Sequence, residues 1–89
     1  MNTDTNINVI IPEGIGDPKY SNSFRTSFNE TDFQIDFGHQ VAGEDTLNVV
    51  SRITIPTSVM KKFVVTLFMT AQSYEKQFEQ DLGFGGIKK

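Results

Sequence analysis

The chain has 89 residues, no cysteine, a single histidine and a formal net charge of −3. A chain of this length forms one small domain with a marginal core, and without cysteine it has neither disulfides nor thiolate metal sites to stabilise it. The negative charge and the scattered Lys and Arg residues argue against electrostatic capture of nucleic acid. Residues 1–6 are polar and no apolar run approaches bilayer length, so we expect a cytoplasmic protein without a membrane segment.

The first expected element is a short strand at residues 7–11, where apolar side chains recur before Pro12. Glycine and proline then predict a loop at residues 13–19. Two longer strands follow, and each of them has one apolar face. The residues on these faces are Phe24, Thr26 and Phe28 on the first strand and Phe33, Ile35 and Phe37 on the second.

The turn between these two strands, at residues 29–32, predicts their register. Pairing Phe28 with Phe33 brings every apolar residue of the hairpin to the same face. The same pairing places Arg25 opposite Asp36 on the other face.

A third long strand is expected at residues 47–55, after a connection at 42–46 that contains Gly43. Pairing Ile35 with Ile53 sets Arg52 beside Asp36, so the outer face of the sheet carries a row of Arg25, Asp36 and Arg52. Cross-strand ion pairing is the ordinary explanation of such a row. The alternative is a site that recognises a phosphate or a carboxylate.

The last expected element is a long helix at residues 57–82, after Pro56 closes the third strand. Thr57 or Ser58 can cap its first amides, and the glycines from Gly83 onward can stop it. Its apolar residues step by three or four positions, which keeps them on one side of a helix. This helix stripe consists of Met60, Val64, Leu67, Ala71, Tyr74 and Phe78.

The stripe also predicts assembly. A helix of about 26 residues is about 39 Å long, whereas strands of about nine residues span about 30 Å, so the second half of the helix should overhang its own sheet. A homodimer or a higher homo-oligomer would cover the excess apolar surface. The expected contact residues are Leu67, Phe68, Ala71, Tyr74 and Phe78. The outer sheet face and the strand at 7–11 are the alternative surfaces.

Strands followed by a single helix predict an α+β fold. We expect a four-stranded antiparallel meander with the C-terminal helix packed on one face. The domain should cover residues 7–83, with a disordered start at 1–6 and a flexible glycine-rich tail at 84–89.

No residue pattern in the chain predicts catalysis, a metal site or a cofactor. No acid, cysteine or second histidine nearby in sequence forms a recognisable site with His39, and the glycines after the helix lack the context of a phosphate loop. We therefore expect a non-enzymatic protein that binds other proteins, as a scaffold or in a chaperone-like role. A small-ligand or anion-binding module is the first alternative, and a phage-encoded inhibitor of a host enzyme is the second.

Several short motifs resemble those of a family of small bacterial proteins catalogued only as a domain of unknown function. The motifs lie at residues 20–22 (Tyr-Ser-Asn), 33–37 (Phe-Gln-Ile-Asp-Phe), 50–53 (Val-Ser-Arg-Ile), 56 with 61 and 62 (Pro, Lys, Lys), and 74–78 (Tyr-Glu-Lys-Gln-Phe). The resemblance covers residues 7–83 and implies the fold and a bacterial or phage origin, but no activity. In layout alone, the chain is also similar to the bacterial export chaperone that binds unfolded chains.

Overall fold

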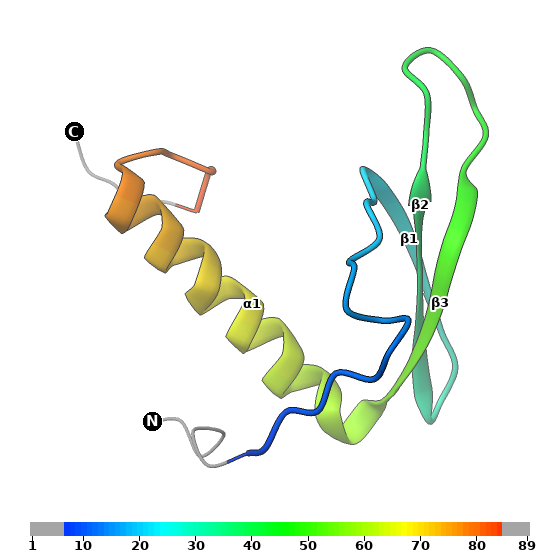
Figure 1. Cartoon of the computed structure of the whole chain (residues 1–89), viewed down its shortest axis with the longest axis horizontal. Helices are drawn as coiled ribbons and strands as arrows, with labels where there is room; N and C mark the ends of the chain where they lie inside the picture. The colour runs from blue at the N-terminus through cyan, green and yellow to red at the C-terminus, as the bar shows by residue number, and fades with distance from the viewer. Residues whose placement is uncertain (1–6, 85–89) are drawn as a thin grey trace.

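The computed structural model describes residues 7–84, in which three strands precede one helix. The strands are β1 (Ser23–Phe28), β2 (Asp32–His39) and β3 (Asn48–Pro56), and they form an antiparallel sheet in the order β1-β2-β3. The helix α1 (Thr57–Phe78) leaves the end of β3 and diverges from the sheet, so that the two form the arms of a V (Figure 1). The α+β class and the meander are thus confirmed.

The predicted register is confirmed at every position on which it rested. Phe28 pairs with Phe33, Arg25 with Asp36, and Ile35 with Ile53. Asn29 stabilises the tight turn between β1 and β2, because its side-chain oxygen accepts hydrogen bonds from the backbone amides of Thr31 and Asp32, each at 2.9 Å. This register brings apolar residues of all three strands to one face, which we call the apolar sheet face: Phe24, Phe28, Phe33, Ile35, Phe37, Ile53 and Ile55.

A bulge interrupts the pairing of β2 with β3 near the far end of the sheet. Phe37 pairs with Ser51 but Gly38 pairs with Val49, so Val50 has no partner on β2. The backbone of β3 approaches Gly38 so closely that an added Cβ would overlap the Asn48 carbonyl and lie 3.0 Å from Val49 Cα. Only glycine fits at this position of β2.

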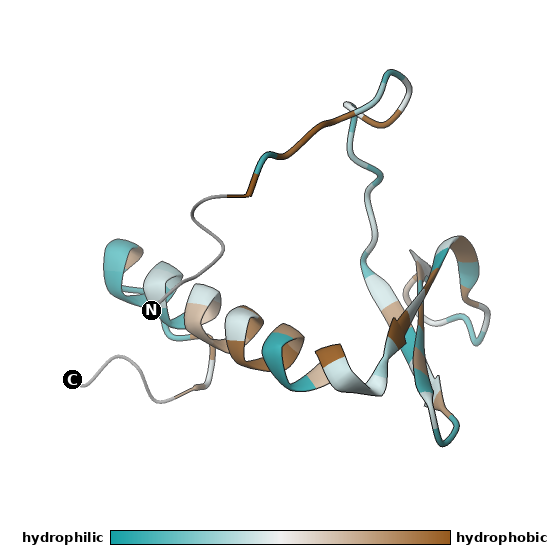
Figure 2. Ribbon diagram, turned by 90° about the horizontal axis from the view of Figure 1, so that it is seen from below, coloured by the Kyte–Doolittle hydropathy of each residue, from teal (hydrophilic) through white to brown (hydrophobic). Residues whose placement is uncertain are grey.

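The expected fourth strand does not form. All residues from 7 to 20 are exposed, and none of them belongs to a strand. In Figure 1 this segment overlaps the V, whereas Figure 2 shows that it runs clear of the helix. Alternating apolar residues predict a strand face, but a strand also needs a neighbouring strand to pair with, and this segment pairs with none among residues 7–84. The sheet therefore has three strands.

The predicted start of the helix at Thr57 is confirmed, but its predicted cap and its predicted end are corrected. At the start, the N-cap is Pro56, without a side-chain cap. At the end, the helix stops at Phe78 rather than at residue 82, because Glu79 adopts the left-handed conformation (φ 53°) and donates its amide to the Glu75 carbonyl. The expected disordered start at 1–6 and most of the expected tail lie outside the described residues.

The expectation that the helix packs across its own sheet is wrong. Thr57 follows Pro56 directly, so no loop residue separates β3 from α1, and the Thr57 amide donates to the Thr31 carbonyl at 2.9 Å. Connections that fold a helix back onto a sheet usually have about two to six residues. The direct junction holds the first turn of α1 at the end of the sheet and directs the rest away from it.

Candidate functional site

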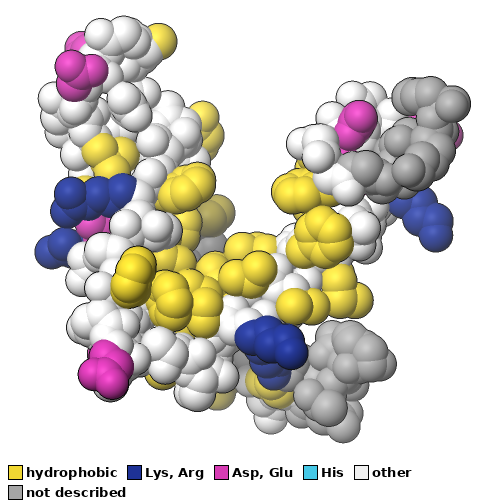
Figure 3. Space-filling view, turned by 180° about the vertical axis from the view of Figure 1, so that it is seen from behind, with side chains coloured by type: hydrophobic (Ala, Val, Ile, Leu, Met, Phe, Trp, Pro, Cys, Tyr) yellow, Lys and Arg dark blue, Asp and Glu magenta, His cyan; other side chains and the backbone are white. Residues whose placement is uncertain are grey.

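The space between the two arms of the V is lined by apolar side chains, and we call it the hollow. Figure 3 shows hydrophobic side chains gathered along both of its walls, with the basic side chains of the sheet on the opposite, outer face. On the sheet wall, Phe24 is 66% exposed, Phe28 is 77% exposed and Ile53 is 44% exposed. Such side chains are normally covered in a folded domain.

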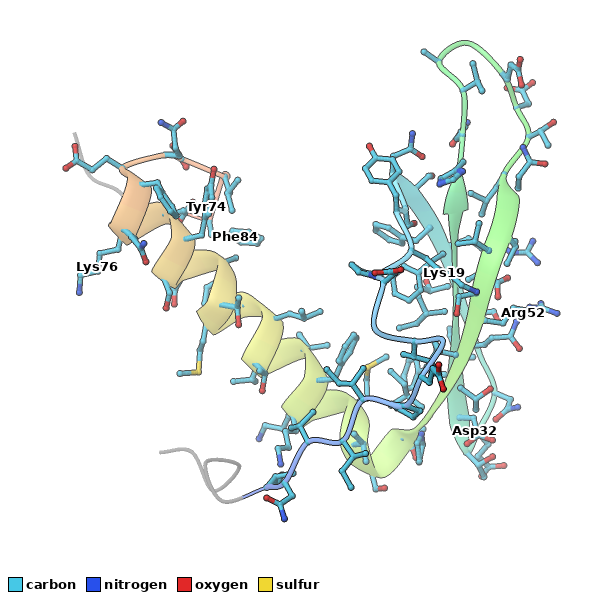
Figure 4. The ribbon with its side chains drawn as sticks, viewed as in Figure 1. Lys19, Asp32, Arg52, Tyr74, Lys76 and Phe84 are labelled. Carbon is cyan, nitrogen blue, oxygen red and sulfur yellow. The ribbon has the colours of Figure 1, made fainter. Side chains whose placement is uncertain are left out.

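The helix wall of the hollow carries the helix stripe. Leu67 is 53% exposed and Phe78 is 55% exposed, although both belong to the most apolar side of the helix. The ring of Tyr74 packs against the ring of Phe78 at a tilt of 45°, with the ring centroids 5.2 Å apart. Tyr74 points toward the sheet, whereas Lys76 points away from it (Figure 4). The stripe thus faces the sheet across the hollow without touching it over most of its length.

Very little of this apolar surface is buried within the chain. Ile35, at the centre of the apolar sheet face, is the only fully buried hydrophobic residue among residues 7–84. The whole chain exposes 7806 Å², roughly 2,600 Å² more than a compact protein of its mass. Its radius of gyration is 15.9 Å, against about 12 Å for a compact chain of this length. The single copy is open.

The five residues predicted to form an oligomer contact lie on the helix as expected. Ala71 is half-buried, and the other four are at least 41% exposed. Phe68 differs from the rest, because Phe84 of the returning chain packs edge-on against its ring at a centroid distance of 5.4 Å. Four of the five side chains are therefore accessible, and the fifth is small.

No structural role was predicted for Glu75 from the sequence. Glu75 is fully buried, because residues 80–84 fold back over it. Its Oε2 accepts the Leu82 amide at 2.7 Å and the Phe84 amide at 3.4 Å, while Oε1 has no hydrogen-bond partner in the part of the chain described. The signal was the glycine-rich segment that follows the helix, whose backbone amides can approach a carboxylate. Glu75 anchors the segment that carries Phe84.

The outer face of the sheet carries the predicted row of charges. Asp36 is buried beneath two arginines. Its two carboxylate oxygens accept hydrogen bonds from Arg25 Nε and Arg52 Nε, each at 2.8 Å. The hydrogen bonds from Arg52 and then Arg25 hold the pKa of Asp36 below its ordinary value of 3.8. The bond to Asp36 in turn raises the pKa of Arg52. The depression beside Arg25 is also lined by Asp45, which adds negative charge where an anion would bind.

His39 lies exposed at the end of β2. Its Nε2 is 2.6 Å from the Tyr20 carbonyl oxygen, and its ring lies 5.6 Å from that of Tyr20. A carbonyl only accepts, so Nε2 donates the hydrogen. This contact fastens the start of β1 to the end of β2. Across residues 7–84, no three His, Cys, Asp or Glu side chains form a group that could hold a metal ion.

The fold and the hollow define a class of small α+β proteins in which a three-stranded meander is followed by one long helix that leaves its own sheet uncovered. Within this class, the chain belongs to the family described as "Protein of unknown function (DUF3467)", whose model matches residues 1–80. No curated protein and no solved structure matches the chain significantly. No helix within residues 7–84 is long and apolar enough to cross a bilayer.

Proposed function

We propose that the protein is a non-enzymatic interaction module that works as a homo-oligomer, most simply a homodimer, and that the hollow is its interaction surface. The observation that carries the proposal is the contrast between a continuous apolar lining and a core with Ile35 as its one fully buried hydrophobic residue among residues 7–84. Burial of apolar surface is the main favourable term in both folding and association. A chain that leaves its apolar surface exposed gains the free energy of burying that surface when it associates with another chain.

The amount of surface supports an oligomer in particular. A stable interface buries about 800 Å² on each partner, and obligate homodimers bury more than about 1,000 Å² on each. The roughly 2,600 Å² that the chain exposes beyond a compact protein of its mass includes the exposed segment 7–20 as well as the hollow, and it is larger than such an interface requires. Oligomerisation is also a common source of stability for small domains that have no disulfides and bind no metal.

Light scattering on the purified protein tests this proposal. A homodimer has twice the 10.0 kDa mass of the chain. A solution that contains only 10.0 kDa particles at high concentration would refute the oligomer. A chaperone-like role would show in the same experiment as a dimer that also keeps an unfolded substrate chain from aggregating, whereas a scaffold would have no such effect.

The anion-binding alternative has less support. Both arginines on the outer face of the sheet already donate hydrogen bonds from Nε to Asp36, and Asp45 lines the depression beside Arg25. An added phosphate would compete with a carboxylate that is bound within the same sheet. Thermal unfolding in the presence of phosphate and nucleotides tests this alternative. Stabilisation by one ligand that disappears in Arg52→Ala would favour it over the interaction module.

A further inference from the structure

We infer that two copies of the chain exchange helices. In this arrangement α1 of each copy lies in the hollow of the other and covers the apolar sheet face of its partner. The inference rests on the proposed homodimer and adds to it which surfaces meet. It needs no partner other than a second copy, because one chain provides both the open sheet and the uncovered helix.

The first argument is the junction between β3 and α1. No residue separates Pro56 from Thr57, and the bond from the Thr57 amide to the Thr31 carbonyl fixes the first turn of the helix against the β1–β2 turn. To cover its own sheet, the helix would have to swing across the hollow toward the sheet, and the junction has no loop residue that could allow this rotation (Figure 1). The junction therefore disfavours packing within one chain, whereas packing on a second chain needs no change at the junction.

The second argument is the match in length between the two surfaces. The 22 residues of α1 extend about 33 Å, and the nine residues of β3 span about 30 Å. A partner helix can therefore cover the sheet from end to end. The exposed residues of the stripe, Val64 and Leu67 among them, then meet Phe24, Phe28 and Ile53, which are the exposed residues of the apolar sheet face.

The third argument is symmetry. A two-fold axis between two V-shaped copies makes two equal contacts, each between the sheet of one copy and the helix of the other. Both surfaces left open in one copy are then buried in the dimer. A dimer that paired helix with helix would bury the stripe but would leave Phe24, Phe28 and Ile53 in water. Exchange of helices covers both walls of the hollow.

The equal contacts allow a test by mixing two variants. Ile53→Glu places a charge on the sheet wall, and Leu67→Lys places one on the helix wall. Each variant alone damages both contacts of its own dimer, so each is expected to lose dimerisation. In a mixture, Ile53→Glu and Leu67→Lys fall within the same contact of the mixed dimer, where they carry opposite charges, and the other contact is wild type. The mixture should therefore recover a dimer made of one chain of each kind.

The matched controls are Thr54→Glu on the outer sheet face and Ser73→Lys, which lies off the helix stripe. Both positions are exposed, and both control variants should remain dimeric. Native mass spectrometry of the mixture, with one chain isotope-labelled, identifies the mixed dimer. Far-UV circular dichroism shows whether each sample is folded. If the charged variants cannot be produced, Ile53→Ser and Leu67→Ser are to be mixed in the same way, with the same recovery expected.

The outcomes separate this inference from the proposed oligomer. Loss of the dimer in both variants and its recovery on mixing support the exchange. A dimer that survives Ile53→Glu but not Leu67→Lys indicates pairing of helices, and it overturns the exchange while the oligomer stands. A mixture that stays monomeric or unfolded shows that the two walls do not meet across copies, which also overturns it. A monomeric wild type refutes both.

Discussion

Dilution is the perturbation that most directly tests whether the hollow must be covered for the protein to stay folded. A single copy buries one hydrophobic residue fully in the part of the chain described, so the folded, separated copy should not accumulate. Unfolding then converts a dimer into two unfolded chains in one step. For such a transition the melting temperature depends on protein concentration.

The size of the effect follows from chain length. Two chains of 89 residues, at about 2.1 cal/mol/K per residue, have an unfolding entropy of about 0.37 kcal/mol/K. Each tenfold dilution disfavours the dimer by about 1.4 kcal/mol. Dividing this free energy by the unfolding entropy predicts that the melting temperature falls by about 4 °C for every tenfold dilution.

Circular dichroism melts at several concentrations, each a tenfold dilution of the last, measure this dependence. The control is the equimolar mixture of Ile53→Glu and Leu67→Lys, which should show the same slope at a lower melting temperature, because the proposed exchange makes it a dimer as well. A melting temperature that stays constant on dilution, at concentrations where light scattering finds the dimer dissociating, would refute the reasoning. It would mean that one copy is stable with its hollow open.

Three further predictions concern the sheet. Ile35→Asp should leave the domain unfolded, because it removes about 1.5–3 kcal/mol of stabilisation from apolar burial and places a charge in the core. Ile35→Val should lower the free energy of unfolding by only about 0.5–1.5 kcal/mol, and urea denaturation measures both variants. Because the pKa of Asp36 is lowered in the fold, its ion pairs stabilise the protein fully above its ordinary pKa of 3.8. This contribution should be lost as the pH falls below 3.8, so the wild type and Asp36→Asn should converge in stability in acid, and an equal gap at both extremes would contradict it. Gly38→Ala should lower the free energy of unfolding by about 1–3 kcal/mol, because the added methyl group overlaps the backbone of β3. Gly16→Ala, where the added methyl group meets open space, should cause no measurable change, and thermal melts compare the two variants.

The register of the sheet could be predicted from the sequence because two independent constraints agree. The alternation of apolar residues decides which face each side chain occupies, and the length of the turn at Asn29 decides which residues are opposite each other. A shift by one residue would have exposed every apolar side chain of β2. The charge row of Arg25, Asp36 and Arg52 then followed from the same register without further assumptions.

The end of the helix could not be predicted because it depends on contacts made after the helix. Glu79 is an ordinary helix former, and only its left-handed backbone ends α1 at Phe78. That conformation turns residues 80–84 back over Glu75, whose carboxylate receives two of their amides. Periodicity describes a helix while it continues. It contains no information about a buried acid that stabilises the chain returning over it.

The orientation of the helix was predicted wrongly for a different reason. An apolar stripe specifies that something must cover it, but the same stripe fits a sheet of its own chain and a sheet of a second copy equally well. The deciding feature was present in the sequence, since Pro56 closes the strand and Thr57 opens the helix with nothing between them. With a loop of a few residues, cover within one chain would be the simpler solution. Without one, the apolar residues of the stripe stay uncovered in a single copy, and this uncovered surface is the basis of the proposed dimer.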